Sequence, residues 1–377
     1  MLKKSYDVIV VGGGAVGAST LYALSQNGIS DTLLLEGKNH LGRGSTGAWG
    51  SLIRRYHLNS RTTELAMESV PYYLNFSERV GRVAGFVETG SLYFLKKHGL
   101  DLLQAKVAQM NRGPLKMELI GAQEGKKRFP SFHWYEDDVA LYESYAGYAC
   151  PWTTTQSWVD SACEAGAEFA VGCPVVDFMV EADKVLGVKV RGGDTFFAGT
   201  IILATGAWSN EVSEKLGITL PIEMRVIQVN HFHRQNRQTR DPFFIDPEAQ
   251  AFGRPAPDGS FVGGCLEWGS EPPKGFVETM SLQEANRAKH HLSARLNWIK
   301  NASLLGGKRA VEAYTSDLNG ILAFSEKYRN LLIATGWSCA GFTLAPVIGQ
   351  KASQMVLGSE VSLLPVSRVS VQADPHV

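Results

Sequence analysis

The fold of this chain is decided by Asp7–Glu36, which reads DVIVVGGGAVGASTLYALSQNGISDTLLLE. The apolar run Val8–Val11 predicts a buried parallel strand, and it leads directly into a GxGxxG turn at Gly12–Gly17. A helical pattern follows at Ala18–Gln26, and a second apolar strand at Thr32–Leu35. A strand, a glycine turn, a helix and a strand in this order predict a Rossmann-like unit.

Each part of this unit has a task in binding a dinucleotide. Gly12 permits the tight turn, Gly14 lets the backbone approach a pyrophosphate, and Gly17 allows the helix to pack closely on the strand. The start of the helix, with Ala15 and Val16, offers free N–H groups and a positive dipole end to the phosphates. The alternative, a glycine-rich loop in an ordinary α/β sheet, does not explain the whole order.

The residues after the second strand extend the predicted site. Glu36 is placed to accept hydrogen bonds from ribose hydroxyls, and Gly37 follows it in the same loop. The small, hydroxyl-rich segment beyond contains Gly44, Ser45 and Thr46, which we expect on a second face of the pyrophosphate. This segment could instead only cap the next helix. At this point the sequence indicates an adenine dinucleotide, equally NAD or FAD.

Composition limits the class of protein. A length of 377 residues favours two domains, and 44% hydrophobic with 20% charged residues is typical of a soluble globular protein. Thirty-seven basic residues balance 37 acidic ones, so we expect no nucleic-acid partner. No apolar run approaches the roughly 20 residues of a membrane helix.

Cysteine and histidine spacing limits the class further. The five cysteines are odd in number and show no CxxC pattern, which favours free thiols and a cytoplasmic location. The nine histidines show no ligand spacing. His231 and His233 share one face of a predicted strand, but ordinary pocket or surface roles are favoured over a metal, and we predict none.

Two further strands end in glycine turns far along the sequence. The strand at 200–204 runs into Thr205–Ser209, and the strand at 331–334 runs into Thr335–Phe342 before a closing helix at 345–357. Both strands are expected to resume the first sheet. The domains must therefore interleave.

Together these three signatures resemble those of the D-amino-acid-oxidase-like FAD oxidoreductases, the group that holds glycine oxidase, monomeric sarcosine oxidase and their dehydrogenase relatives. The resemblance runs from about Tyr6 to the 350s and implies FAD as the cofactor. It places Val175 at the adenine by main-chain pairing and Gly206 with Trp208 along the ADP. It also places the last turn, with Gly336, Gly341, Phe342 and Thr343, against the flavin, where a helix N-terminus can stabilise negative charge.

The resemblance implies a fold with two parts. We expect an α/β architecture in which a Rossmann-like FAD-binding domain is interleaved with an α+β substrate domain built on an antiparallel sheet. The FAD-binding domain is assigned residues 1–80, 151–218 and 321–365, and the substrate domain 81–150 and 219–320. Within these, 113–151 is expected to be irregular and 281–300 to form a polar helix.

Departures from the family pattern bear on the chemistry. Glu312 stands where sarcosine oxidase relatives carry the cysteine that bonds the flavin, so we predict noncovalent FAD. Glu267 stands where those relatives carry a lysine that promotes the reaction with oxygen, and a carboxylate there opposes a superoxide-like anion. Thr343 replaces a lysine that holds the substrate carboxylate. Arg54 is then the first choice for a carboxylate clamp and Arg55 the second. The predicted catalytic residues are Arg54, Glu267 and Thr343.

These features predict oxidation of the C–N bond of a small amine or amino acid by hydride transfer to the flavin, giving an imine that hydrolyses. The alternatives are a flavin dehydrogenase for a 2-hydroxy acid or polyol phosphate, and a flavoprotein subunit that passes electrons to a partner. The electron acceptor would be oxygen, a quinone or a protein. Aromatic candidates for the substrate pocket are Trp49, Phe252, Trp268, Tyr314 and Trp337.

Overall fold

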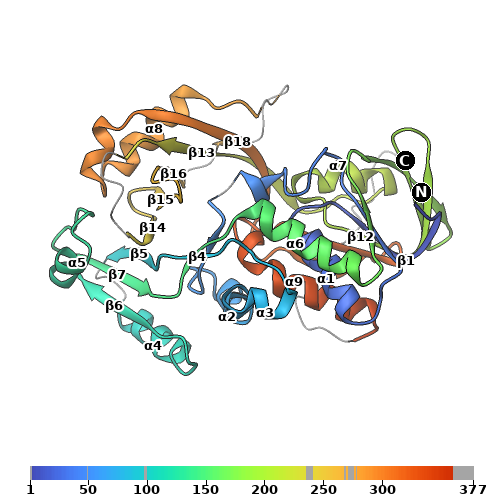
Figure 1. Cartoon of the computed structure of the whole chain (residues 1–377), viewed down its shortest axis with the longest axis horizontal. Helices are drawn as coiled ribbons and strands as arrows, with labels where there is room; N and C mark the ends of the chain where they lie inside the picture. Colours follow the sequence, from blue (N-terminus) through green and yellow to red (C-terminus); the bar gives the residue numbers. More distant parts are fainter. Residues whose placement is uncertain are drawn as a thin grey trace.

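The computed structural model describes residues 2–48, 50–96, 100–234, 241–266, 269–270, 276 and 278–359. These residues form two lobes that lie side by side along the long axis of the molecule (Figure 1). One lobe contains both ends of the described chain and part of its middle, and the other contains two separate internal segments.

The first lobe is built on an eight-stranded sheet. Its strands are β1 (Ser5–Val11), β2 (Thr32–Leu35), β9 (Glu168–Ala170), β10 (Val175–Glu181), β11 (Lys184–Val190), β12 (Thr195–Leu203), β19 (Ile321–Phe324) and β20 (Leu331–Thr335). Strand β1 pairs in parallel with β2 and β12, and β12 pairs in parallel with β20. The prediction that both late strands return to the first sheet is confirmed.

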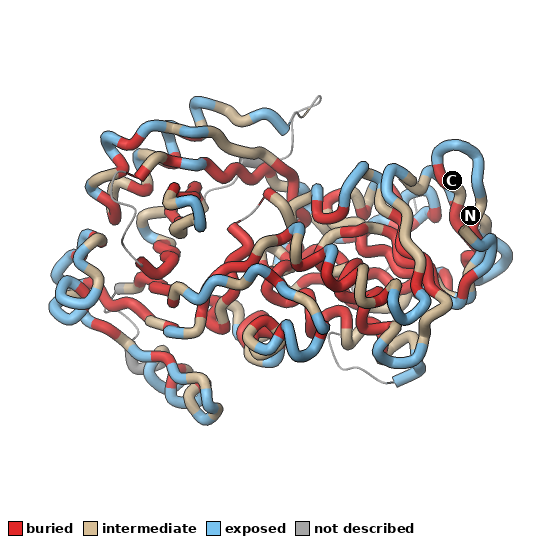
Figure 2. The backbone as a smooth tube through the Cα atoms, viewed as in Figure 1, coloured by how far each residue is buried: buried red, intermediate tan, exposed pale blue. Residues whose placement is uncertain are grey.

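The central strands of this sheet are apolar on both sides, and both faces are covered. Val8 and Val10 of β1 pack with the helices of one face, while Ile9 and Val11 pack on the opposite face. Figure 2 shows buried stretches of the chain running through the interior of this lobe. The helices and 3-10 turns of the lobe are α1 (Ala15–Gln26), η1 (Ser45–Gly47), α2 (Ser60–Leu74), α3 (Phe76–Val80), α6 (Pro151–Glu164), η2 (Gly206–Trp208), α7 (Ser209–Ser213), η3 (Glu214–Leu216) and α9 (Gly341–Val356). Helices α1, α2, α6 and α9 cover one face, and β10, β11 and the short α7 and η3 pack on the other.

Small residues bring α1 and α9 into close contact. A Cβ on Gly349 would lie 2.6 Å from the Ser19 backbone, and the Ser19 hydroxyl donates to the Ala345 carbonyl at 2.7 Å. Two helices from opposite ends of the sequence are thereby locked together.

Helix α9 begins at Gly341, four residues earlier than predicted, and continues through Pro346. A proline has no N–H for the carbonyl four residues before it, which here belongs to Phe342. The buried Tyr73 hydroxyl donates to that carbonyl instead. A side chain from α2 thus allows the helix to tolerate its proline.

The second lobe is built on a nine-stranded sheet, in which β14 and β5 pair in parallel and the other pairs are antiparallel. Helix α8 (Leu282–Leu292) packs on this sheet. The strands are β5 (Ser91–Lys96), β6 (Met117–Gly121), β7 (Asp138–Glu143), β13 (Ile222–Phe232), β14 (Phe243–Asp246), β15 (Ala251–Pro255), β16 (Phe261–Cys265), β17 (Gly269–Ser270) and β18 (Leu304–Thr315).

Two predictions in this lobe are wrong. The segment 113–151 is not irregular, since it forms β6, β7, α5 (Ala122–Arg128) and β8 (Gly147–Tyr148). Strand β7 is buried on nearly all of its residues, so it lacks the polar–apolar alternation that would indicate a strand in the sequence. The polar helix ends at Leu292 rather than Lys300, and η4 (Asn297–Asn301) follows. The remaining elements are α4 (Leu100–Met110) and a small sheet of β3 (Leu52–Ile53), β8 and β4 (Val87–Glu88).

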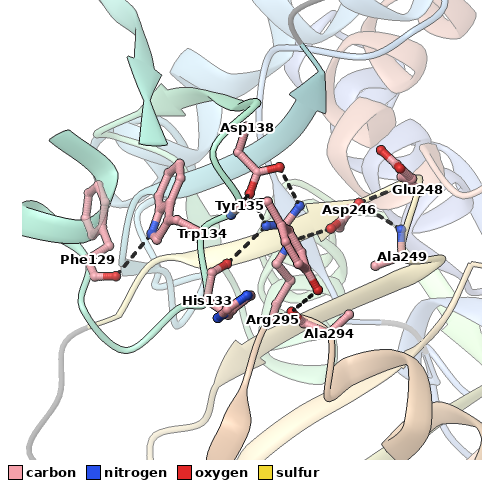
Figure 3. Close-up of polar contacts among 10 residues, drawn as sticks. All are labelled: Phe129, His133, Trp134, Tyr135, Asp138, Asp246, Glu248, Ala249, Ala294 and Arg295. Carbon is pink, nitrogen blue, oxygen red and sulfur yellow. Dashed lines mark hydrogen bonds and ion pairs between the residues drawn. The ribbon is translucent and has the colours of Figure 1, made fainter. Parts of the chain in front are cut away.

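A buried arginine ties the second lobe together (Figure 3). Arg295 is 2% exposed and forms ion pairs with Asp138 of β7 and Asp246 of β14. Its Nη1 also donates to the His133 carbonyl at 3.0 Å, and the Asp138 carboxylate accepts from the Tyr135 N–H at 2.7 Å. Three segments that are distant in sequence therefore contact the Arg295 guanidinium. Its ion pairs and hydrogen bonds offset the free-energy cost of removing this charge from water.

Three predictions concern cysteines, membrane helices and metals. All five cysteines are free thiols. Within the described ranges, no helix combines the length and apolar character needed to cross a membrane. The same residues contain no group of three or more potential metal ligands.

Candidate functional site

A cavity of about 380 Å³ lies at the carboxyl ends of β1, β2, β12 and β20 and reaches β18 of the second lobe. It is lined by all of the predicted cofactor residues except Gly17 and Thr343. Those that line it are Gly12, Gly14, Ala15, Val16, Glu36, Gly37, Gly44, Ser45, Thr46, Val175, Gly206, Trp208, Gly336, Gly341 and Phe342. Residues far apart in the sequence therefore converge on one site.

The three motif glycines have different surroundings. Gly12 has φ +110°, and a Cβ on it would lie 2.4 Å from the Ala204 carbonyl oxygen. A Cβ on Gly17 would lie 1.8 Å from the Gly12 oxygen, so this glycine permits packing and lies outside the cavity lining. A Cβ on Gly14 would meet only the Thr46 hydroxyl, at 3.3 Å. Gly14 is therefore the position where a ligand can approach the backbone closely.

Backbone N–H groups of its own loop hold the Glu36 carboxylate in place. One carboxylate oxygen accepts from the Gly13 N–H and the other from the Lys38 N–H, each at 2.7 Å. Each oxygen keeps a further lone pair for a ribose hydroxyl. Lys38 and Arg191 also line the cavity and were missed by the sequence analysis. The position of Lys38, directly after Glu36 and Gly37, could have indicated it; no local motif indicates Arg191.

The hydroxyl-rich segment makes contacts that the sequence did not reveal. The Thr46 hydroxyl oxygen accepts from the Ala15 N–H at 3.1 Å, at the start of α1. The Ser45 hydroxyl donates to the Val311 carbonyl of β18 at 2.8 Å, which holds η1 against the second lobe. Ser45 lines the cavity, and in this structure its hydroxyl hydrogen is shared with the Val311 carbonyl. Its role at the pyrophosphate stays a prediction.

The far end of the cavity is formed by β18 and the turn before α9. Ser338 and Cys339 adopt the left-handed backbone region, with φ of +48° and +68°. The Ser338 N–H donates to the Ala313 carbonyl at 3.2 Å, and the Tyr314 hydroxyl is hydrogen bonded to the Cys339 thiol. Strained backbone held by several contacts is typical of ligand sites.

Two buried polar atoms at this end have no partner within the described protein. They are the Oε2 atom of Glu312 and the indole Nε1 of Trp337, and both residues line the cavity. Burial raises the pKa of Glu312 to about 7, with hydrogen bonding from Cys339 acting in the opposite direction. Because both residues line the cavity, these two atoms are available to hydrogen bond with a ligand that has polar groups at this end.

Arg54 and Arg55 have different surroundings. Arg55 is 3% exposed and pairs with Glu143 of β7 at 3.4 Å, so its charge is used within the protein. Arg54 donates to the Tyr56 carbonyl and lies over the Tyr93 ring, 5.5 Å from its centroid. Burial lowers the pKa of Arg54, while interactions with Tyr93, Glu143 and Cys339 act in the opposite direction, and Cys339 belongs to the cavity wall. No ion pair links Arg54 to a carboxylate of the described residues.

Of the other two predicted catalytic residues, Thr343 lies among the described residues and Glu267 does not. The Thr343 hydroxyl is buried and donates to the Leu52 carbonyl of β3 at 2.7 Å, outside the cavity lining. It joins α9 to the segment that leads to Arg54. Glu267 lies outside the described residues, as do Trp49 and Trp268. Of the remaining aromatic candidates, Trp337 lines the cavity, Tyr314 binds Cys339, and Phe252 is a core residue.

Comparison with known proteins identifies the family. The profile described as FAD dependent oxidoreductase matches residues 7–355. This chain belongs to that family. The cofactor of this family is FAD, and the cavity fits it. Gly14 leaves room for a pyrophosphate, and Glu36 can accept hydrogen bonds from a ribose. The unpartnered atoms of Glu312 and Trp337 can hydrogen bond to a polar ring system.

Individual relatives extend this likeness. Human mitochondrial dimethylglycine dehydrogenase is 23% identical over 95% of this chain, which spans only 43% of that protein's length. Monomeric sarcosine oxidase from Streptomyces avermitilis is 25% identical over 94% of each chain. The solved structure of L-proline dehydrogenase from P. horikoshii superposes with a TM-score of 0.87 at 24% identity and covers 97% of this chain and 96% of its own. The last likeness concerns the fold.

Proposed function

We propose that this oxidoreductase oxidises the C–N bond of a small amine or amino acid. The relatives named above are named for dimethylglycine, sarcosine and L-proline, each of which carries an amine and a carboxylate. When bound, FAD supplies the acceptor for the hydride that leaves the carbon beside the nitrogen. The resulting imine then takes up water and hydrolyses.

The observation that carries this proposal is the position of Arg54. Arg54 is half-buried and lies outside the cavity lining, but its charge interacts with Cys339 of the cavity wall. It also interacts with Glu143, although the two form no ion pair. An arginine in this situation favours binding of an anionic group by a bidentate pair of hydrogen bonds. A substrate carboxylate held by Arg54 would place the adjacent carbon toward the end of the cavity formed by Trp337 and Cys339.

Other residues contribute by holding this arrangement. The hydrogen bond from Thr343 to the Leu52 carbonyl fixes β3 against α9, and Arg54 follows β3 directly. We therefore propose a positioning role for Thr343 rather than contact with the substrate. The N-terminus of α9, with Gly341 and Phe342 in the cavity wall, would stabilise negative charge that develops there.

The test is anaerobic bleaching of the bound flavin by a panel of compounds. Sarcosine, dimethylglycine, L-proline and glycine represent the proposed class, amines without a carboxylate test the role of the anion, and 2-hydroxy acids and polyol phosphates represent the alternative. We expect bleaching by one or more of the amino acids. Bleaching by hydroxy acids or polyol phosphates alone would refute the proposal.

Two further parts of the proposal have their own measurements. Noncovalent FAD predicts that acid precipitation releases all the yellow colour, and colour retained on the denatured chain would contradict it. The carboxylate of Glu267 predicts slow reoxidation by air relative to a quinone or dye, with Glu267→Lys accelerating the reaction with oxygen. The free thiols support a reducing, cytoplasmic compartment, which belongs to the same proposal.

A further inference from the structure

Glu312 is a buried acid at the ring end of the FAD cavity. The adenosine end is marked by Glu36 and Val175, and the pyrophosphate passes Gly14, so the flavin ring system must lie toward Glu312, Trp337 and the α9 N-terminus. The Glu312 side chain is 8% exposed, and its Oε2 atom has no hydrogen-bond partner. An uncompensated buried carboxylate is costly, whereas a neutral carboxyl group can donate a hydrogen bond.

The groups around Glu312 do not neutralise it. On its own strand lies Tyr314, and from the turn before α9 comes Cys339. Strand β13 places Arg225 opposite it in register, but that guanidinium lies over the Tyr314 ring at 4.6 Å and pairs with Glu223. The segments η1 and η2 carry no titratable side chain.

Arg54 is the remaining charge near this end of the cavity, and it interacts with Cys339 rather than pairing with Glu312. Burial raises the pKa of both the Cys339 thiol and the Tyr314 phenol. Neither group therefore ionises near neutral pH, and guanidinium groups stay charged throughout. Glu312 is the one group facing this part of the cavity, among the described residues, that can change charge there.

We propose that Glu312 contacts the bound flavin ring system as a neutral acid and takes up a proton when FAD binds, so that FAD affinity depends on pH. The ring system would remove the remaining water from the carboxyl group, which disfavours the charged form. A proton from solvent then adds to Oε2 or Oε1, and the carboxyl O–H donates to a polar atom of the cofactor. Glu312 thereby becomes a cofactor-binding residue that no glycine motif indicates.

The direction of the pH dependence follows from linkage. In the FAD-free chain the pKa of Glu312 is about 7, and cofactor binding raises it. Below that pKa the acid is already neutral, and affinity is constant. Above it, binding requires proton uptake, and the FAD dissociation constant rises by up to about tenfold for each pH unit.

The experiment measures FAD affinity of the FAD-free chain by flavin fluorescence from about pH 6 to about pH 9, with the pH range set by this linkage. The variants are Glu312→Gln, which keeps the shape and removes the titration, and Glu211→Gln as a control. Glu211 also lines the cavity but is exposed. Calorimetry of wild type in two buffers with different ionisation enthalpies counts the protons taken up at about pH 8 and does not depend on a variant folding.

We expect weaker FAD binding with rising pH and uptake approaching one proton for wild type and Glu211→Gln, and constant affinity for Glu312→Gln. No proton uptake by wild type, or an unchanged slope in Glu312→Gln, would overturn the proposal. The proposal requires only that the family member binds FAD. A failure of the substrate panel therefore leaves this test intact, and a failure here leaves the proposed amine oxidation intact.

Discussion

Two buried polar clusters in this protein differ in whether their polar atoms have hydrogen-bond partners. Arg295 in the second lobe is paired with Asp138 and Asp246, and it also donates to one backbone carbonyl, that of His133 (Figure 3). Glu312 and Trp337 at the cavity each keep a buried atom without a partner. The first cluster is complete within the protein. Under the proposal above, FAD supplies the partner in the second cluster, so the comparison separates a group that stabilises the fold from a group that binds a cofactor.

The largest effect is expected where the complete cluster is broken. Arg295→Ala leaves two buried carboxylates without their cation, which should lower the free energy of unfolding by about 3 to 5 kcal/mol. Urea unfolding of the FAD-free chain measures this. Arg329→Ala is the control, because its ion pair with Asp183 is exposed and should contribute little. Equal effects of the two variants would show that the Arg295 cluster does not hold the lobe.

Removing the acid at Glu312 should raise the stability of the FAD-free chain, whereas removing Arg295 should lower it. The pKa of Glu312 is raised from 4.5 in the unfolded chain to about 7 in the folded one. The folded state then binds more protons, so this group lowers the stability of the FAD-free chain as pH rises from about 4.5 to about 7. Above about pH 7 the free energy of unfolding has fallen by its full amount, on the order of 3 kcal/mol.

Glu312→Gln should therefore be more stable than wild type above about pH 7 and lose the advantage toward pH 4.5, since only wild type has this linkage. Thermal unfolding of both FAD-free proteins across the pH range measures the difference. A stability difference that does not change with pH would contradict the raised pKa.

Arg54 is a charged group for which we propose that the substrate, rather than the protein or FAD, supplies the partner. If it binds a carboxylate, Arg54→Gln removes a charged hydrogen-bonded pair and should raise KM by about 10- to 100-fold while changing kcat less. Arg54→Lys should restore part of the loss, because it keeps the charge without the bidentate geometry. Steady-state kinetics with an amino acid that bleaches the flavin provide both constants. A fall in kcat with KM unchanged would contradict a binding role.

The smallest effect is expected for the hydrogen bond between the Tyr73 hydroxyl and the Phe342 carbonyl, beside the cavity. Tyr73→Phe leaves the Phe342 carbonyl without its donor, because Pro346 supplies none, and should cost about 1 to 2 kcal/mol of unfolding free energy. Tyr72→Phe is the matched control, since that hydroxyl binds Gln350 at a less buried site. If Tyr73→Phe changed FAD affinity but not stability, the distinction drawn between complete and incomplete groups would fail.

The sequence alone predicted the central strands of the first sheet and the residues that line the cavity between Gly12 and Glu36. Gly12, Gly14 and Glu36 lie within one strand-turn-helix-strand unit, where spacing fixes geometry because the strand and helix periods are known. The strands at 200–204 and 331–334 were also placed correctly, since apolar runs that end in glycine turns suit only a buried parallel sheet.

Only the tertiary structure decided the other end. Whether Ser45 faces phosphate or the Val311 carbonyl, and which of Arg54 and Arg55 is already paired, depends on contacts with strands far away in the sequence. The unpartnered atoms of Glu312 and Trp337 depend on packing in the same way. Local patterns fix what neighbouring residues do, whereas burial and pairing are properties of the assembled cavity.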